Sequence, residues 1–384
     1  MVLLRLLIVF LIVVFNALRW VGLNFSPPGF NVDEAAGAAQ VLCIQQTGHD
    51  FFSHHFPFFA EGIGGGGYTG PYLYGEVLWT SIFGSSIGSF RSFLALLTSL
   101  TILFLYRWVR RRAGERVALY AALSASIMPW AFQFSRIAND LPLFVLFLVM
   151  ALWASDLHFR GRKIGLFAFV PLVVFLGASI PFVGRLKVLV LWSDYSINPY
   201  LNANGFDLFA GFVKQLLEHF SSAFLFWKGD ANLQRSIGTV GMLSWLDDVA
   251  VLGALVFLIR SGAWSNAEKT LLKISLVGIV IGVLPSALTW EAVPHAGRSI
   301  AAWPFFAVFT GLMLSKLEQL FKNSRIPAAG FLVVAVGFFS FYLCHYFTDY
   351  PVRAQPYFQS ENAPLAQAYH RMTVEGRSCE DIRN

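Results

Sequence analysis

Charged residues are scarce in this sequence. Asp, Glu, Lys and Arg make up 13% of the 384 residues, about half of the ~25% that is typical of soluble domains. Hydrophobic residues account for 56% and aromatic residues for 16%. The chain contains neither a separate soluble domain nor an obvious internal repeat. These proportions exclude an ordinary soluble protein and indicate an integral membrane protein.

Cysteine is also rare, and positive charge forms no continuous stripe. The three cysteines, Cys43, Cys344 and Cys379, are too few and too widely separated to indicate a disulfide framework. The net charge is +6, but the basic residues cluster in short loops between apolar runs. This pattern is typical of membrane topology and gives no indication of nucleic-acid binding.

Long apolar runs follow one another along most of the chain, each near the ~20 residues that a bilayer requires. The first run lacks the small-residue cleavage site of a signal peptide, so we expect it to be retained. The arginine-rich loop at 107–116 is predicted to be cytoplasmic by the positive-inside rule. The predicted spans are residues 2–23, 88–109, 117–134, 140–157, 164–182, 245–259, 272–289, 299–315 and 326–346.

We therefore predict an all-α integral membrane protein, a polytopic bundle of about nine transmembrane helices. The apolar segment 184–192 is either an interfacial helix or half of a further hairpin, which would raise the number to about eleven. Alternation of the spans places residues 24–87 and 183–244 in outer loops, the first containing short amphipathic helices. Residues 1–346 form the membrane domain and residues 347–384 an extracytoplasmic tail. The predicted location is the cytoplasmic (inner) membrane.

The glycine-rich run at 61–72, EGIGGGGYTGPY, lies in the first outer loop. It lacks the Lys-Ser/Thr ending of a phosphate-binding P-loop. We interpret it as a flexible loop, either a linker or a lid.

Two adjacent acids, Asp33 and Glu34, follow the first span. Helix capping is the simpler interpretation, because Asn31 suits the N-cap and Glu34 then occupies the third helical position. Capping accounts for Glu34 better than for Asp33. An acid at the mouth of a helical bundle is also able to take a proton from an attacking hydroxyl group.

Three further groups of polar residues lie on the same predicted side of the membrane. Arg136 and Asp140 would share one face of a continuous helix, although Asp140 with Pro142 also suits a helix start. His295 and Arg298 would donate to an anionic oxygen, or Arg298 would extend to lipid headgroups. The loop WKGDANLQR supplies Lys228, Asp230 and Arg235, for which solvated charge is the simpler interpretation. Acids and bases therefore converge at one mouth, as transfer of a group from a phosphate ester requires.

Several of these stretches, in this order, resemble the glycosyltransferase C superfamily, of the protein O-mannosyltransferase and lipid A aminoarabinose transferase type. The stretches are the DE pair in DEAAGAAQVLCIQQTG followed by Pro57, Arg91 at the start of the second span, SR ahead of the fourth, WKGDANLQRSIGTVGMLSW and PHAGRSIAAWP. Each is weak alone, and together they cover most of the chain to about residue 358.

The resemblance implies a membrane glycosyltransferase that takes a sugar from a polyprenyl-phosphate donor on the extracytoplasmic face. It implies Asp33 as the base or acceptor-binding acid and a role for Asp140, and the adjacent Glu34 is the third candidate catalytic acid. It also implies that basic residues of the later outer loops, Arg298 and either Lys228 or Arg235, hold the donor phosphate. From their position at the same mouth, we expect Arg136 and His295 to join them. The acceptor would be a hydroxyl group of a lipid, a glycan or a protein, and a single displacement would invert the anomeric configuration.

Two other classes stay open at this point. A polysaccharide ligase or polymerase would also use a lipid-linked donor but would depend on Arg and His without needing Asp33. A secondary transporter would carry intramembrane charges, but its fold predicts inverted repeats and broken helices near the midplane. No metal is assigned. A divalent cation shared by Asp33 and Asp140 is an alternative, and the histidines at 49, 54 and 55 do not fit a zinc pattern.

Overall fold

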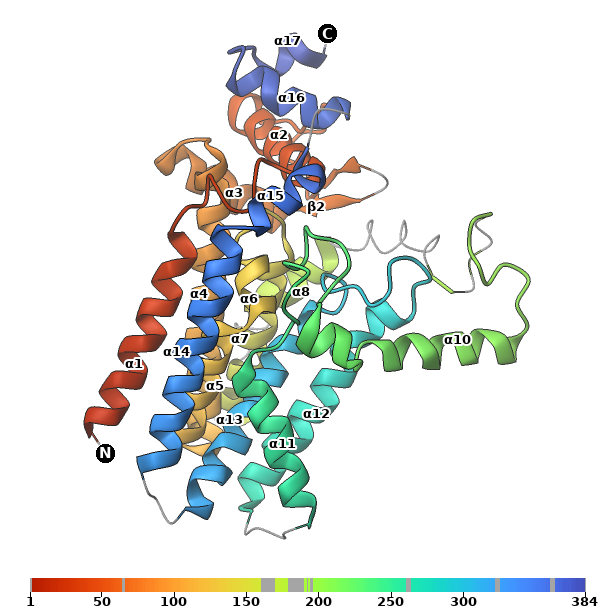
Figure 1. The fold of residues 1–384 in the computed structure, drawn as a ribbon. Coiled ribbons are helices and arrows are strands. Elements are labelled where there is room, and N and C mark those ends of the chain that lie inside the picture. The colour runs from red at the N-terminus through yellow and green to blue at the C-terminus, as the bar shows by residue number, and fades with distance from the viewer. Residues whose placement is uncertain are drawn as a thin grey trace.

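Long helices run side by side in a bundle, with a smaller group of elements at one end (Figure 1). We call this group, which comprises α2, the hairpin β1–β2, α16 and α17, the head. The structure is a computed structural model, and it describes residues 2–63, 66–159, 170–178, 190–191, 193, 196–259, 264–321, 325–359 and 363–383.

Five helical segments in the described residues are long and apolar enough to cross a bilayer. They are Val2–Trp20 (α1, Val2–Ala17, with a 3-10 turn), Ile87–Ala113 (α4), Asn266–Ala287 (α12), Ile300–Leu320 (a 3-10 turn and α13, Trp303–Leu320) and Ile326–Phe347 (within α14, Arg325–Phe347). Each matches a span predicted from the sequence. The chain is a multi-pass membrane protein.

Shorter helices complete the bundle. They are α5 (Glu115–Ile127), α6 (Pro129–Phe134), α7 (Leu141–Phe159), α8 (Val170–Ala178) and α11 (Trp245–Ile259). The predicted span at 117–134 is therefore wrong as one helix. It breaks at Met128, whose extended backbone (ψ 122°) is the conformation that a following proline favours. Most of the predicted span 164–182, and of the segment 184–192, lies outside the described residues.

Helices α5 and α13 form the centre of the bundle, and nearly all of their side chains are buried. Small residues allow this close approach. A side chain at Gly311 of α13 would meet the backbone of α5, because its Cβ would lie 2.5 Å from the carbonyl oxygen of Val117. Close packing of small residues is a common way for membrane helices to associate.

The head is more ordered than the sequence predicts. Helix α2 (Val32–Thr47) is buried from Glu34 to Ile44, so it is not the amphipathic surface helix that we expected. Strands β1 (Phe59–Glu61) and β2 (Gly67–Thr69) pair antiparallel, and α3 (Gly70–Phe83) follows directly. The glycine-rich run thus contributes to a hairpin and a helix start.

The predicted tail is also structured. The last span is followed by α15 (Tyr350–Ala354), a 3-10 turn (Gln355–Phe358), α16 (Pro364–Thr373) and α17 (Cys379–Arg383). Helix α16 packs against α2, and Leu365, Ala366, Ala368 and Met372 of α16 belong to the same buried cluster as α2. The two segments lie together at the top of Figure 1.

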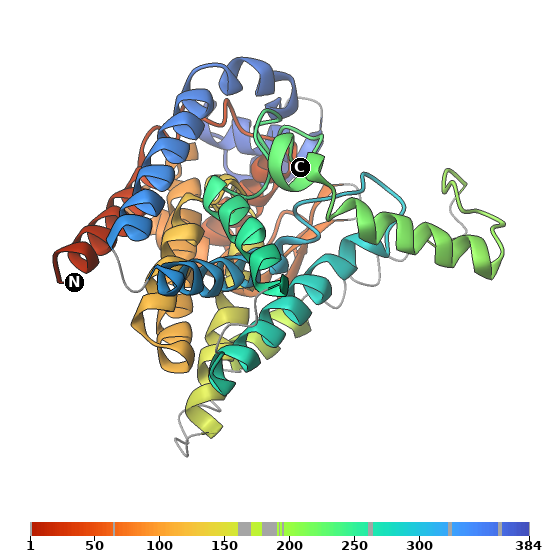
Figure 2. The same ribbon diagram turned by 60° about the horizontal axis from the view of Figure 1, so that its bottom comes forward.

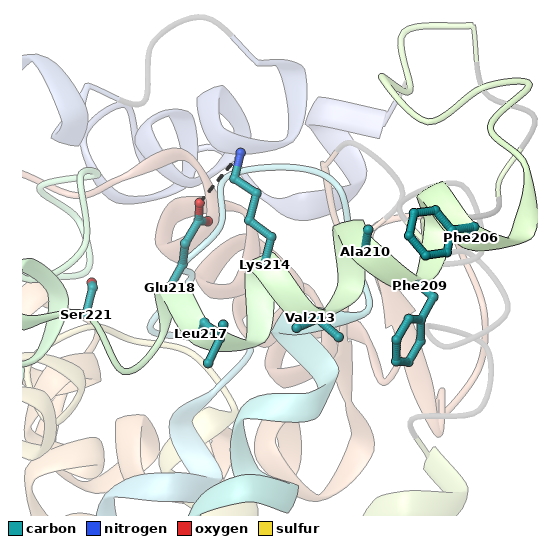
Figure 3. A pocket seen from close by; sticks show the side chains of 8 residues that line it. All are labelled: Phe206, Phe209, Ala210, Val213, Lys214, Leu217, Glu218 and Ser221. Atoms are coloured by element: carbon teal, nitrogen blue, oxygen red, sulfur yellow. Dashed lines mark ion pairs between the residues drawn. The ribbon is translucent and has the colours of Figure 1, made fainter.

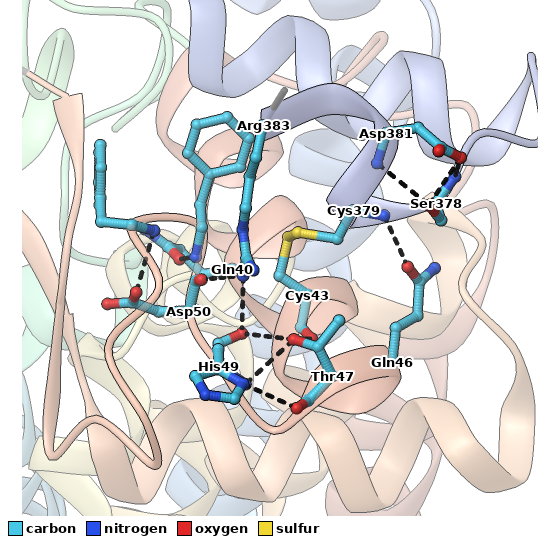
Figure 4. The surroundings of a disulfide bond; sticks show 12 residues. Gln40, Cys43, Gln46, Thr47, His49, Asp50, Ser378, Cys379, Asp381 and Arg383 are labelled. Carbon is cyan, nitrogen blue, oxygen red and sulfur yellow. Dashed lines mark hydrogen bonds between the residues drawn. A yellow bond between two sulfur atoms is a disulfide. The ribbon is translucent and has the colours of Figure 1, made fainter.

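A disulfide between Cys43 and Cys379 joins α2 to α17 (Figure 4). The Gln46 side chain accepts a hydrogen bond from the Cys379 backbone, and Arg383 donates to the backbone carbonyl oxygens of His49 and Asp50. The sequence analysis, which found the cysteines too few and too widely separated to indicate a disulfide framework, missed this bond. The two partners are 336 residues apart, and no spacing pattern signals a pair at that separation.

Replacing Cys379 with serine is expected to free α17 and to expose the segment after Phe347 to proteases. A native disulfide contributes about 2–4 kcal/mol, which here stabilises the contact of a short terminal helix with α2. Limited proteolysis with mass-spectrometric mapping of the cut sites checks this, and reduction of the wild-type protein should reproduce it. Cys344→Ser, at an exposed cysteine outside the disulfide, is the matched control. Equal cleavage rates in all variants would contradict the prediction.

Candidate active site

The start of α2 carries a complete capping box. The Asn31 side chain accepts from the Glu34 backbone N–H at 2.8 Å, and Glu34 accepts from the Asn31 backbone N–H at 3.1 Å. This confirms the capping interpretation of the sequence. Helix α2 therefore begins at a defined residue, with Asn31 as its N-cap.

Glu34 is also the centre of a buried network. Arg91 of α4 forms a bidentate ion pair with it, with both N–O distances 2.9 Å, and neither side chain is exposed. The backbone N–H of Ala138 donates to the same carboxylate at 2.8 Å. Each carboxylate oxygen therefore accepts two hydrogen bonds from the protein. Glu34 joins α2 to α4 and to the turn between α6 and α7.

Asp33, in contrast, is exposed at the first turn of α2. The Tyr68 hydroxyl of β2 donates to the Asp33 backbone carbonyl at 2.6 Å, and the Tyr68 ring lies directly against Gly37, where a Cβ would be 2.9 Å from the ring. Surrounding protein atoms withhold water from the Asp33 carboxylate and raise its pKa, while the Arg235 charge opposes the rise. The position of this carboxylate is thus fixed through its backbone and its side chain is free to react.

Asp140 lies in the turn between α6 and α7, half-buried beside the hairpin. Its carboxylate accepts from the Thr69 backbone N–H at 3.4 Å. Burial raises the pKa of Asp140 to about 6, with the hydrogen bonds from Thr69 opposing the rise. The charges of Asp33 and Asp140 both raise the pKa of Tyr68, so both acids lie near the hairpin that carries this residue.

Arg136 does not share a helix face with Asp140, because residues 135–140 are a turn. The guanidinium is fully buried. It donates to the backbone carbonyl oxygens of Ser26 (2.6 Å) and Arg19 (2.7 Å). The prediction of a shared face was wrong because the chain leaves the helix before Asp140. Pro142 does lie in the first turn of α7, as the sequence predicted.

A second group of side chains joins two loops from the later half of the chain. Asp230 is only 3% exposed and accepts from the Ala296 backbone N–H at 2.8 Å, while Arg235 approaches the same oxygen at 3.4 Å. The Trp130 indole N–H donates to the carbonyl of Ala296 at 3.0 Å. The interpretation of Asp230 as a solvated charge was therefore wrong. It fixes the loop containing His295 and Arg298 against the loop containing Arg235.

His295 is neutral in this environment. Its Nδ1 accepts from the Arg298 backbone N–H at 3.1 Å, so its remaining proton is on Nε2. Burial, together with the charges of Arg235 and Arg298, lowers the pKa of His295 to about 2. The imidazole is thus a neutral hydrogen-bond donor with a defined tautomer.

Arg298 is oriented by acceptors on its own loop. Its guanidinium donates to the Thr289 hydroxyl at 3.0 Å and to the Glu291 backbone carbonyl at 2.8 Å, and pairs with the Glu291 carboxylate at 3.2 Å. Burial lowers the pKa of Arg298, and the Glu291 charge opposes this. An entering anion would compete with Glu291, whose side chain is half exposed.

Arg235 connects the two groups electrostatically. Its positive charge lowers the pKa of Asp33 on one side and those of His295 and Arg298 on the other. An acid at the head and a cationic cluster at the outer loops therefore face the same region. Lys228 is exposed at the edge of this cluster.

Sequence reasoning missed four contributors to this region: Tyr68, Thr69, Asp230 and Glu291. Tyr68 and Thr69 were hidden in the glycine-rich run that we interpreted as flexible. Asp230 and Glu291 act on partners that only the fold brings near. Arg91 offered a usable signal, because an arginine inside an apolar span requires a buried partner.

No group of three or more His, Cys, Asp or Glu side chains within the described ranges is arranged to hold a metal ion. The histidines near the end of α2 make other contacts. His54 pairs with the buried Asp50 at 2.9 Å, and the His49 and His55 rings lie 4.7 Å apart.

A family model described as dolichyl-phosphate-mannose-protein mannosyltransferase matches residues 72–187. The search of curated protein sequences gave no match. The family match covers α3 to α7 and the segment that follows them. It confirms the resemblance that the sequence motifs indicated.

Similar solved structures are distant. The oligosaccharyltransferase AglB from Archaeoglobus fulgidus, in complex with an inhibitory peptide and a dolichol-phosphate, has a TM-score of 0.41 and 14% identity over 90% of this chain and 56% of that chain. The same enzyme in the apo form has a TM-score of 0.43 and 15% identity, over 97% of this chain and 59% of that chain. ArnT from Cupriavidus metallidurans, bound to undecaprenyl phosphate, has a TM-score of 0.41 and 12% identity, over 98% of this chain and 74% of that chain. The chain thus spans little more than half the length of AglB.

Proposed function

We propose that this chain, which resembles glycosyltransferases of the C superfamily, transfers a sugar from a polyprenyl-phosphate donor to an acceptor hydroxyl group. One observation carries the proposal. The charge of Arg235 acts on the exposed carboxylate of Asp33 and also on His295 and Arg298. A proton acceptor and an anion-binding cluster therefore border one region, as displacement of a phosphate by a hydroxyl group requires.

In this proposal Asp33 is the general base. It takes the proton from the acceptor hydroxyl as the oxygen attacks the anomeric carbon. The raised pKa of Asp33 brings it closer to the value at which a base is most effective near neutral pH. The bond between the anomeric carbon and the phosphate oxygen breaks as the new glycosidic bond forms, which inverts the configuration. Asp140, which also lies near Tyr68, would orient the acceptor.

The departing polyprenyl phosphate carries the electron pair of the broken bond and gains negative charge. The Nε2–H of His295 and the guanidinium groups of Arg298 and Arg235 would stabilise that charge. Removing one such donor costs about 3 kcal/mol of barrier in comparable sites. The phosphate would replace Glu291 as the ion-pair partner of Arg298. The exposed Lys228 would attract the negatively charged donor toward the site.

Two of the residues expected in the site take other roles in the proposal. Glu34 is saturated by Arg91, Asn31 and Ala138, so we assign it to positioning α2. Arg136 donates to backbone carbonyl oxygens, so we assign it to the turn that presents Asp140. Neither side chain would touch the substrate.

A lipid-linked donor also fits the predicted topology. The arginines at the end of α4 favour a cytoplasmic location for that end by the positive-inside rule, which supports an extracytoplasmic head and a site that faces outward from the inner membrane. Nucleotide sugars are cytoplasmic, whereas a lipid-linked sugar reaches this side within the bilayer.

The proposal predicts release of polyprenyl phosphate from polyprenyl-phosphate sugars by membranes that contain the protein. Membranes with and without the protein should be given the same panel of hexose and pentose donors. The anomeric configuration of the product is then determined by NMR. Release from at least one donor, with inversion, is the expected result. Retention would refute a single displacement. Turnover of lipid diphosphate donors alone would overturn the donor class.

A further inference from the structure

Helix α10 (Gly205–Glu218) lies across the direction of the membrane spans. It extends sideways from the bundle in both views, below the head in Figure 1 (Figures 1 and 2). It is attached at the end of α12 that Ala287 closes. The Gln215 amide, with its nitrogen turned toward them, donates to the backbone carbonyl oxygens of Ala287 (2.9 Å) and Thr289 (2.5 Å). The helix is therefore attached at the level where α12 ends.

The surface of α10 divides into three faces. Gly211 and Gln215 are buried and form the face attached to the protein. Asp207, Lys214 and Glu218 form a polar face, on which Lys214 and Glu218 pair at 4.0 Å. An apolar face is exposed to a degree unusual for large side chains: Phe206 is 78%, Phe209 63% and Leu217 63% exposed. Val213 completes this face at helical spacing.

The apolar and polar faces point in opposite directions. Phe209, Val213 and Leu217 project toward the side on which the spans run, whereas Lys214 and Glu218 project toward the head (Figure 3). An interfacial helix has this arrangement, with its apolar face in the membrane and its charged face in water.

The apolar face also continues a surface that faces lipid. Helix α12, one of the five segments long enough to cross a bilayer, exposes Leu276 (48%), Val277 (56%), Val280 (43%) and Ile281 (59%). A bilayer that covers these side chains reaches the underside of α10 at the end of α12. The same apolar medium would then cover both surfaces.

We propose that α10 is a membrane-surface helix whose Phe209, Val213 and Leu217 side chains insert into the leaflet on the head side. Lipid of that leaflet therefore covers the apolar face of α10. The attached end of α10 lies beside Thr289, which accepts from Arg298. Insertion would therefore fix the height of the loop that contains His295 and Arg298 relative to the lipid headgroups.

The test places single fluorescent labels on the full-length protein in lipid vesicles. Cys344→Ser removes the reactive exposed cysteine, and labelling without reductant keeps the disulfide. Cysteines then replace Phe209, Leu217 or, as the matched control on the opposite face, Lys214. Depth is read from quenching by spin-labelled phospholipids and by aqueous iodide.

Labels at 209 and 217 are expected about 5–10 Å into the boundary between headgroups and acyl chains, quenched by lipid and shielded from iodide. The label at 214 should give the reverse. Equal iodide quenching at all three positions would show a solvated helix and overturn the proposal. Labels at 209 and 217 that both quenchers fail to reach would show a covering protein or a second copy, and would overturn it too. The readout needs no donor, so it is independent of the proposed glycosyl transfer.

Discussion

Asp33→Asn is expected to lower the rate of sugar transfer by about 10²–10⁴-fold, the range that a positioned general base contributes. Asparagine has nearly the same shape but is unable to accept the proton of the attacking hydroxyl group. The fold should survive, because Asp33 is exposed and its contact with Tyr68 runs through the backbone carbonyl. The measurement is release of polyprenyl phosphate from the best donor, at matched expression in membranes.

The loss should fall on kcat more than on KM, since the base acts as the bond forms. Activity of the wild type should also decline with falling pH, because a protonated Asp33 is unable to take a proton and its pKa is raised. Glu115→Gln, at an exposed acid in the first turn of α5, is the control and should keep full activity. Equal turnover in Asp33→Asn and wild type would remove Asp33 from the mechanism and favour a ligase or polymerase that depends on Arg and His.

Arg91→Met is expected to be the most destabilising single substitution in the head. It leaves the Glu34 carboxylate buried without its counter-ion, and breaking a buried pair in this way typically costs about 3–5 kcal/mol. Arg91 also donates to the backbone carbonyl oxygens of Leu23, Pro27 and Gly29, so the chain leaving α1 would lose its anchor. The thermal unfolding midpoint of the detergent-solubilised protein should fall, and the yield with it.

The double variant Arg91→Met with Glu34→Gln distinguishes the cost of the uncompensated Glu34 charge from the cost of the lost Arg91 contacts. The amide removes the uncompensated charge and keeps an oxygen that accepts from Ala138 or Asn31. The double variant should therefore be more stable than Arg91→Met alone. Arg107→Met, at an exposed position of the same helix, should leave the midpoint unchanged. If Arg91→Met behaved like Arg107→Met, the buried pair would not be what joins α2 to α4.

The sequence predicted the parts of this molecule that depend on local pattern. Five spans follow from length and apolarity alone, and the capping box at Asn31 and Glu34 follows from residues three apart. Pro142 in the first turn of α7 is of the same kind, because it reflects the backbone preference of a single residue. Such features need no knowledge of distant partners.

The features that sequence reasoning missed depend on partners far along the chain. Asp230 looked solvated because Ala296, whose N–H it accepts, is 66 residues away. Tyr68 looked like part of a flexible loop because its contact with α2 requires Gly37, which one sequence does not single out. Arg136 and Asp140 were expected on one helix face because they are four residues apart, but the chain leaves the helix between them.

The bridge between Cys43 and Cys379 has a consequence for how the protein is made. Helix α2 is synthesised early, but its partners α16 and α17 emerge only after all the spans. The contacts of α2 with α16 and α17 therefore form only after the intervening segments have been synthesised. Because disulfides persist in oxidising compartments, completion of the head would report that the segments carrying Cys43 and Cys379 have reached one such compartment.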